Sequence, residues 1–445
     1  MERFSMEDLP DNFKESIRLV DMIWNVSESD IDCVAHDLQE NLNKSSLSIN
    51  DIILMIDKKL SFYSKNFMPL KDLYFRILED FKIENATKLL PEKLYFTPEE
   101  LKGIEYAFKP SSLEDIIFRD DLQSFISASD AKDFNFNQLL GRTLMIDFAA
   151  SKGAVECFKF IYLNHAAVWE TTLEKSFEGG SLEIINICEQ KIQITTGCME
   201  QAIMHHQDEL VRYLVDKYQL SWPWISTMFN YNYKMFFEKL ASCENIYERD
   251  IYGENCMFAA SFHLQLELMK FLISKGYDAD NSKLKSKAPP IIYAISEKRI
   301  DIVKYLLENG AEADNKNSIL TNLTSAIYIN DFDITKLLIE YGADLNRKNA
   351  EGNTPLIVAI DFSTVDIVEL LLSKGADSNL PDHTWNSPLD CAIHKNNLNI
   401  IKLLINYGAN INSAHIERAI QEGNDEIINF LRPAESEKIA ESIEN

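Results

Sequence analysis

Apolar residues recur at helical spacing in five short segments of the C-terminal half, and each segment ends at a glycine. The segments read LMKFLISKG, IVKYLLENG, ITKLLIEYG, IVELLLSKG and IIKLLINYG. Apolar residues three and four positions apart lie on one face of a helix. The pattern therefore predicts amphipathic helices, each closed by a glycine that can adopt the left-handed conformation.

These glycines return at a nearly constant interval of 32 to 34 residues, at Gly276, Gly310, Gly342, Gly375 and Gly408. About twelve residues after each glycine we expect another helix, which Thr354-Pro355 and Ser387-Pro388 start with a capping hydroxyl and a proline. A small residue lies at the centre of each of these helices, namely Ala260, Ala294, Ala326, Ala359, Ala392 and Ala419. A period of this length indicates stacked structural units that bury their apolar faces against one another.

The stretch GADLNRKNAEGNTPLIVAI, from Gly342 to Ile360, closely resembles the ankyrin repeat. Ile357 stands where that family usually has a histidine, so the hydrogen bond of that histidine is missing. The resemblance implies an all-α fold, which is an ankyrin-repeat solenoid of stacked helix pairs with short β-hairpin loops. A helical N-terminal domain would precede it.

Shorter versions of the unit occur earlier in the chain. The small residues Ala149, Ser176 and Ala202 are only 27 and 26 positions apart, which leaves room for a helix pair without a hairpin. Together with LEDIIFRDDLQSFI (113–126) and GAVECFKFIYLN (153–164), they resemble a large protist family of trichomonad type. In that family, a domain of unknown function made of degenerate repeats precedes regular ankyrin repeats.

We divide the chain into four parts on this basis. Residues 1–110 form a helical N-terminal domain, 111–245 the short repeats, 246–432 the regular repeats with a short capping unit, and 433–445 a polar tail. The N-terminal part has a helical stripe, and it has capping boxes at Thr97–Glu100 and at Ser111 with Glu114. The stripe consists of Leu70, Leu73, Tyr74, Ile77, Leu78 and Phe81.

Composition narrows the classes of function. The net charge of −26 would repel nucleic acid and anionic lipid, so we expect neither as a partner. The seven cysteines include no Cys-x-x-Cys pair, and no apolar run approaches a membrane span. We expect a monomer with reduced thiols and no cofactor or metal, in the cytoplasm or alternatively in the nucleus.

The sequence lacks the motifs that are typical of catalytic and metal-binding sites. There is no phosphate-binding glycine motif, nucleophile elbow or zinc-binding His-Glu-x-x-His motif. Adjacent histidines on a helix point about 100° apart, so His205 and His206 would rarely share one metal ion. Their position matches a loop between two repeat helices, which we expect to face solvent. Cys157 and Cys188 align with core positions of other repeats. Trp222-Pro223-Trp224 is either a wedge between repeats or, less favoured, a partner anchor.

A partner would bind along the concave face of the array. The ankyrin resemblance implies contacts at the exposed ends of the first helices and at the hairpin tips. The corresponding helix positions are Ser296, Glu297, Tyr328, Ile329, Asp361, Phe362, His394 and Lys395, and the tip positions are Ala350, Glu351, Asn353, His383, Thr384, Trp385 and Asn386. Alternatively, the N-terminal domain, the chain's own tail or local packing covers the apolar members of this set.

We therefore expect a non-catalytic scaffold or adaptor that recognises a protein. One alternative is a substrate-recruiting subunit of a larger enzyme complex, such as a ubiquitin ligase, that docks through residues 1–110. The other is an enzyme whose active site lies in the N-terminal domain. A recognisable helical dock in residues 1–110 would favour the first, and a polar pocket there the second.

Overall fold

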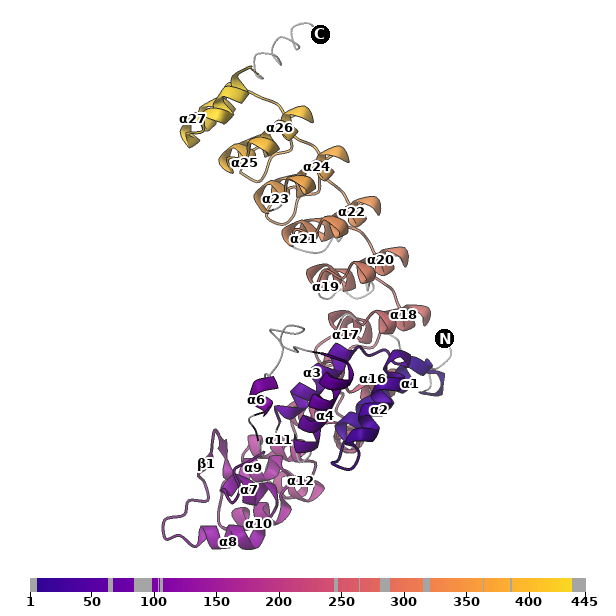
Figure 1. Cartoon of the computed structure of the whole chain (residues 1–445), viewed down its shortest axis with the longest axis vertical. Coiled ribbons are helices and arrows are strands. Elements are labelled where there is room, and N and C mark those ends of the chain that lie inside the picture. The colour runs from indigo at the N-terminus through magenta and orange to yellow at the C-terminus, as the bar shows by residue number, and fades with distance from the viewer. Residues whose placement is uncertain are drawn as a thin grey trace. The chain divides into compact units, whose positions relative to one another are not determined.

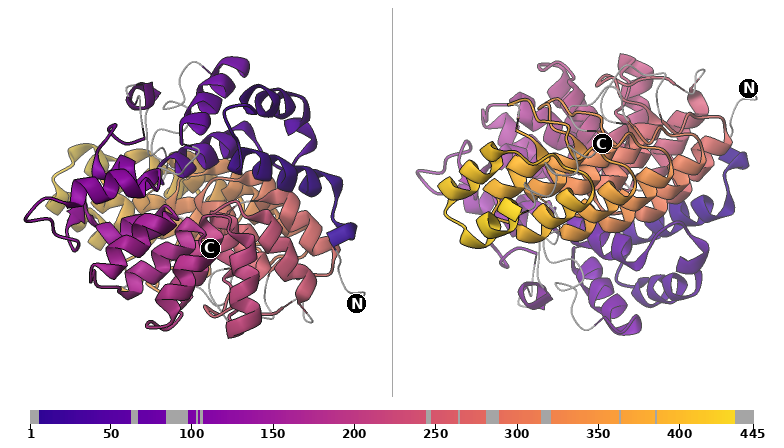
Figure 2. Two further views of the ribbon diagram at one scale, coloured as in Figure 1. Left: turned by 90° about the horizontal axis from the view of Figure 1, so that it is seen from below. Right: turned by 90° about the horizontal axis from the view of Figure 1, so that it is seen from above.

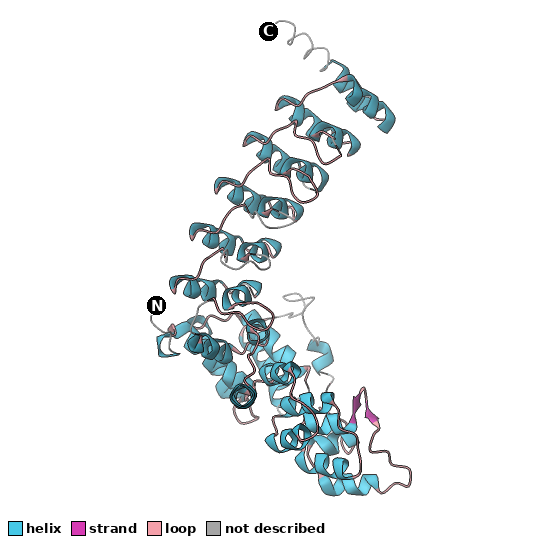
Figure 3. Ribbon diagram, turned by 180° about the vertical axis from the view of Figure 1, so that it is seen from behind, coloured by secondary structure: helices cyan, strands magenta, loops and turns pink. Residues whose placement is uncertain are grey.

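Helices dominate both compact units of the chain, which are Met1–Ala259 (unit 1) and Ala260–Asn445 (unit 2). The computed structural model describes residues 6–62, 67–83, 98–102, 104, 107–243, 247–263, 265–280, 289–314, 321–362, 364–384 and 386–433. Across this described part, the strands are two-residue segments, β1 (Leu139–Leu140) and β2 (Thr143–Leu144), paired antiparallel (Figure 3). The predicted all-α fold class is confirmed.

Unit 1 begins with the N-terminal helices α1 (Asp11–Trp24), α2 (Ile31–Asn41), α3 (Ile49–Leu60) and α4 (Phe67–Asp80). Of two single-turn 3-10 helices, η1 (Met6–Asp8) precedes α1 and η2 (Leu42–Lys44) lies between α2 and α3. Ser48 and Asp51 form a capping box that starts α3. In the predicted stripe on α4, Leu70, Leu73, Tyr74 and Ile77 are buried, whereas Leu78 and Phe81 are only half-buried.

The segment after α4 contains the short helix α6 (Pro98–Lys102), and Thr97 of the first predicted capping box lies outside the described residues. The second predicted box is one residue out of place. Ser112, rather than Ser111, accepts the hydrogen bond from the Asp115 backbone N–H at 3.2 Å and starts α7 (Leu113–Phe118). Ser111 adopts a left-handed φ of 60°, and its N–H donates to the Asp115 carboxylate.

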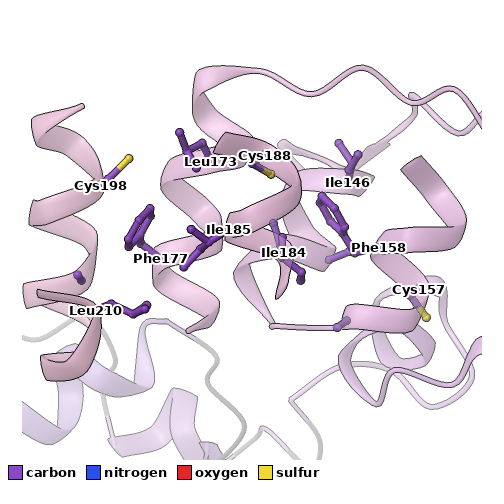
Figure 4. Packing of buried hydrophobic residues seen from close by; sticks show 14 of the residues in the cluster. Ile146, Cys157, Phe158, Leu173, Phe177, Ile184, Ile185, Cys188, Cys198 and Leu210 are labelled. Carbon is purple, nitrogen blue, oxygen red and sulfur yellow. The ribbon is translucent and has the colours of Figure 1, made fainter. Parts of the chain in front are cut away.

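The rest of unit 1 consists of helix pairs without long hairpins. After α7 and α8 (Leu122–Ser129), the pairs are α9 (Met145–Ser151) with α10 (Val155–Leu163), α11 (Glu170–Gly179) with α12 (Leu182–Glu189), α13 (Thr196–Met204) with α14 (Asp208–Tyr218), and α15 (Trp224–Phe229) with α16 (Tyr233–Ser242). Their shared core contains Ile146, Phe158, Phe177, Ile184 and Cys188, all essentially inaccessible to solvent (Figure 4). Neighbouring pairs thus complete one another's core, as the repeat pattern predicts.

Unit 2 is a regular stack in which the first helices form one row and the second helices another (Figures 1 and 2). The first helices are α17 (Cys256–Phe262), which starts just before the unit boundary, α19 (Pro290–Ser296), α21 (Asn322–Tyr328), α23 (Pro355–Phe362), α25 (Pro388–His394) and α27 (Ser413–Glu422). The second helices are α18 (Leu266–Ser274), α20 (Ile300–Glu308), α22 (Phe332–Glu340), α24 (Val365–Ser373), α26 (Leu398–Asn406) and a helical stretch over 425–433.

Local chemistry explains the regularity of unit 2. The five closing glycines have φ values between 85° and 99°, a left-handed conformation that costs a glycine little. Each alanine at a first-helix centre is inaccessible to solvent, which lets neighbouring first helices approach closely. Thr354, Thr321 and Ser387 accept hydrogen bonds from backbone N–H groups in the first turns of their helices.

The helices of the described ranges are too short or too polar to span a bilayer.

Candidate functional site

Eight of the first helices end in a similar backbone arrangement within the described residues. At the helix cap or one residue after it, the chain takes a left-handed φ between 52° and 74°, at Gly153, Gly180, His206 and Tyr231 in unit 1 and at Lys298, Asn330, Asn396 and Gly423 in unit 2. We call the two residues before each left-handed position a first-helix end. In unit 1 these pairs are Ser151–Lys152, Glu178–Gly179, Met204–His205 and Phe229–Asn230. In unit 2 they include Ser296–Glu297, Tyr328–Ile329, Asp361–Phe362 and His394–Lys395, with Asp361–Phe362 placed by its spacing from Ala359.

The left-handed turn leaves carbonyl groups at each first-helix end without a partner inside the helix. In α21, the N–H groups of Asn330 and Asp331 fold back onto the carbonyls of Ile327 and Ala326. Neither of these N–H groups bonds to the next carbonyl, that of Tyr328. The last carbonyls of a helix also carry the negative end of its dipole. Each first-helix end is therefore a hydrogen-bond acceptor with partial negative charge.

The first-helix ends of unit 2 bring four of the predicted residues together. The rings of Tyr328 and Phe362 have centroids 4.6 Å apart at an interplanar angle of 38°. Lys395 Nζ lies 3.3 Å from Asp361 Oδ1 and 5.8 Å from the centre of the Phe362 ring. Phe362 remains 54% exposed. An aromatic pair with a carboxylate and an ammonium beside it is thus open to solvent across α21, α23 and α25.

The other predicted helix positions are more scattered. Ser296 and Glu297 are exposed at the end of α19, and Ile329 is half-buried beside Tyr328. His394 is exposed, and its Nδ1 lies 2.9 Å from Glu422 Oε1 at the end of α27. These residues border the aromatic pair on both sides along the row of first helices.

Burial raises the pKa of the Tyr328 hydroxyl, and the carboxylates of Glu351 and Asp361 raise it further. Tyr328 therefore stays neutral at physiological pH and can donate a hydrogen bond. Glu351 belongs to a hairpin tip, so its interaction with Tyr328 joins the tip to the row of first helices.

The hairpin tips hold most of the remaining predicted residues in exposed positions. Ala350, Glu351, His383 and Thr384 are exposed, whereas Asn353 and Asn386 are half-buried. Asn349 Oδ1 accepts hydrogen bonds from the N–H groups of Glu351 and Asn353, which shapes the first tip. In the next tip, Asp382 Oδ1 does the same for Thr384 and Asn386. Trp385 lies outside the described residues.

In unit 1, the N-terminal helices contact the equivalent first-helix ends (Figure 2). The Lys58 ammonium of α3 donates to the Phe229 carbonyl at 2.9 Å. Trp24 Nε1 of α1 donates to the His205 carbonyl at 3.2 Å. In the reverse direction, the Lys152 ammonium donates to the Phe62 carbonyl at 2.8 Å. Nothing in the sequence around Lys58, Lys152 or Trp24 marks them as contact residues, so these contacts could not be predicted from the sequence.

The expectation that the His205–His206 loop faces solvent is wrong. His206 stacks on Trp24, and His205 packs against Phe62 with ring centroids 4.4 Å apart. Burial, with a contribution from nearby lysines, lowers the pKa of each histidine to about 3, so both are neutral near pH 7. His206 Nε2 lies 2.8 Å from the Asn230 carbonyl, which can only accept, so the proton is on Nε2.

A cavity of about 260 Å³ lies beneath these contacts, between α1, α3 and the repeats. Its charged lining side chains are Lys59, Lys152 and Glu178. Lys59 donates to the Trp24 carbonyl, and Lys152 donates to the Phe62 carbonyl and lies 3.8 Å from Glu178. Backbone carbonyls at or just beyond helix ends therefore already accept hydrogen bonds from both buried lysines. No group of three metal-ligating side chains occurs among the described residues.

Other residues considered for chemistry belong to the core. Cys157 and Cys188 are inaccessible to solvent, and burial raises the pKa of the Cys188 thiol to about 12. Trp224 is buried and packs edge-on against Phe236 at 5.3 Å, while Trp222 is half-buried. These observations favour the packing role for all four side chains.

Comparison with known families agrees with this geometry. A family model described as ankyrin repeats, three copies, matches residues 224–317 and 323–415. The regular repeats are ankyrin repeats. A domain of unknown function, DUF3447, matches residues 164–239, so the predicted order of degenerate before regular repeats is confirmed. The trichomonad-type origin stays a prediction.

Solved structures and curated proteins add little detail. The structure of an ankyrin repeat domain from Acinetobacter baumannii AYE is 27% identical to this chain. The match covers 42% of this chain and 98% of that one, with a TM-score of 0.38. No protein with curated annotation matches the chain.

Proposed function

We propose that this ankyrin-repeat protein is a non-catalytic scaffold or adaptor that recognises a protein partner on the first-helix ends and hairpin tips of unit 2. The observation that carries the proposal is the contact between half-buried Tyr328 and exposed Phe362, flanked by Asp361 and Lys395. Ankyrin repeats support a role in protein–protein interaction.

The chemistry of this surface suits a protein partner. Aromatic side chains give a large contact area for a small loss of side-chain entropy, and they are enriched where binding energy concentrates. The charged groups around the pair give direction and specificity to such a contact. Exposed hairpin tips beside the pair enlarge the surface that one partner can cover.

Proximity labelling with mass spectrometry in the source cell tests the proposal. The intact chain is compared with a chain carrying Tyr328→Ala and Phe362→Ala. A matched control carries Tyr341→Ala and Tyr407→Ala, which remove two exposed aromatic side chains from the ends of second helices. All three chains are first checked for equal helical circular dichroism and melting temperature.

The proposal expects a small set of proteins to be lost with the Tyr328 and Phe362 changes and kept with the control changes. An identical set of labelled proteins for all three chains would contradict it. Loss of the same proteins with both pairs of changes would also contradict it, because the first-helix ends would then have no special role.

A further inference from the structure

The first-helix ends of unit 1 show what kind of segment this backbone arrangement accepts. The segment is mainly helical, since α1 supplies Trp24 and α3 supplies Lys58, while Phe62 lies in the turn just after α3. Its polar contributions are a lysine ammonium and an indole N–H, both donors to first-helix carbonyls. Its apolar contribution is aromatic, because Trp24 lies flat on His206.

Lys58 combines two of these interactions at one first-helix end. Its ammonium donates to the carbonyl of Phe229 and lies 3.7 Å from the centre of the Phe229 ring. A cation is attracted both to the face of an aromatic ring and to the negative end of a helix dipole. One lysine side chain can therefore interact with both the terminal carbonyl and the aromatic ring of a first-helix end.

The same features are present in unit 2. Among the described residues, no donor forms a hydrogen bond with the carbonyl oxygens of Tyr328 and His394, which correspond in the repeat to the Phe229 carbonyl. Phe362 offers an exposed ring, as Phe229 does in unit 1. The Asp361 carboxylate adds a full negative charge beside them, in a chain whose net charge is −26.

Lys395 already shows that this surface attracts an ammonium. It pairs with Asp361 and lies over the Phe362 ring, although at 5.8 Å it is farther from the ring centre than Lys58 is from that of Phe229. Lys395 is exposed, so solvent screens this surface ion pair and keeps it weak. A partner's lysine can replace it at small cost.

We infer that the first-helix ends of unit 2 bind an amphipathic helix of a protein partner that presents lysine and aromatic side chains, in the way that unit 1 binds its own helices α1 and α3. The inference rests on the proposed function and specifies the partner. The lysine donates to the carbonyls of Tyr328 or His394 and approaches Asp361. The aromatic side chain packs on the Tyr328–Phe362 pair.

A displayed library of helical peptides, randomised on one face, tests this inference on the full-length chain. Peptides are selected on the intact protein and then measured against a chain with Asp361→Asn and Phe362→Ala. The matched control is again the chain with Tyr341→Ala and Tyr407→Ala. Circular dichroism and melting temperature establish that each variant is folded.

The expected result is enrichment of lysine with an aromatic residue on the randomised face. Binding should weaken about tenfold or more on the Asp361 and Phe362 variant, which corresponds to about 1.4 kcal/mol. It should be unchanged on the control, and it should weaken as salt increases because the lysine contact is electrostatic.

Two other outcomes overturn the inference and differ in what they say about the proposed function. If the selected peptides depend on Asp361 and Phe362 but are acidic or contain helix-breaking prolines, the binding face stands and the helical, basic partner does not. If no selected peptide distinguishes the intact chain from the variant, both the inference and the proposed binding face fail.

Discussion

Trp24 stacks on His206 with ring centroids 3.7 Å apart and an interplanar angle of 19°. The same indole donates its N–H to the carbonyl of His205, a residue 181 positions away in the chain. The contact therefore joins the C-terminal residue of α1 to the loop between α13 and α14, which belongs to a degenerate repeat. It makes the N-terminal helices part of unit 1 rather than a separate module.

Replacing Trp24 by alanine should destabilise unit 1 strongly. The side chain is only 8% exposed, and its loss removes the stack, the hydrogen bond and a large apolar contact. Large-to-small changes of this kind cost about 3–5 kcal/mol. Urea unfolding followed by circular dichroism measures the effect.

Trp169 provides the matched control, because it is 59% exposed. Trp169→Ala should change the free energy of unfolding by no more than about 0.5 kcal/mol. Equal losses for the two variants would mean that Trp24 is not the anchor of the N-terminal helices.

Acidification should weaken unit 1 between pH 6.5 and 3. His205 and His206 have pKa values of about 3 in the folded chain, because burial disfavours their charged forms. Unfolded histidines titrate near 6.5, so the unfolded state binds more protons in this window and is favoured as pH falls. The stability is fully present above pH 6.5 and should be lower by on the order of 1–3 kcal/mol at pH 5.

The comparison is between urea midpoints at pH 7.5 and pH 5. Lys58, Lys59, Lys152 and Lys175 add to the opposition to a charged His205, while Asp208 partly favours a charged His206. A chain with both histidines replaced by glutamine should lose much of the pH dependence. A slope that persists unchanged in this variant would assign the effect to carboxylates elsewhere.

Gly352→Ala should be more costly than Gly253→Ala, although both glycines have left-handed φ values, 79° and 75°. An added Cβ at Gly352 would lie 2.7 Å from the Cβ of His383 in the next hairpin tip, whereas nothing lies within 4 Å at Gly253. Gly253→Ala should therefore cost only the backbone term, about 1–2 kcal/mol. Thermal melting of the two variants measures the difference, and equal shifts would show that neighbouring tips do not abut.

Maleimide labelling should separate the cysteines by burial. Cys33 is exposed and should react within the folded chain, whereas Cys157 and Cys188 are inaccessible and have raised thiol pKa values because of burial. The thiolate is the reactive form, so these two should react only after unfolding. Peptide mass spectrometry with and without urea gives the answer, and native labelling of Cys188 would contradict the core packing in Figure 4.

Much of the fold follows from the sequence because its determinants are local. The spacing of Gly310, Gly342 and Gly375 marks where helices end, and the alanines between them mark where helices approach. Such features act within one turn of a helix or between adjacent repeats. For the same reason, the pattern indicated the helix pairs of the degenerate repeats and the core positions of Cys157 and Cys188.

The contact between Tyr328 and Phe362 depended on the tertiary structure. The two residues occupy different positions relative to Ala326 and Ala359, and successive positions on a helix point about 100° apart. Repeat alignment placed both on one face but could not bring their rings to 4.6 Å. How far each helix end turns toward its neighbour decides that distance.

The sequence by itself determined the repeat, its period and the residues that fill its core, because these depend on short-range helical periodicity. Only the tertiary structure decided that α1 and α3 contact the first-helix ends of unit 1 and that His205 and His206 are half-buried against them. These contacts join residues more than 140 positions apart through donors to backbone carbonyls. Every helix has such carbonyls at its C-terminal end, so their partners cannot be read from residue type or spacing.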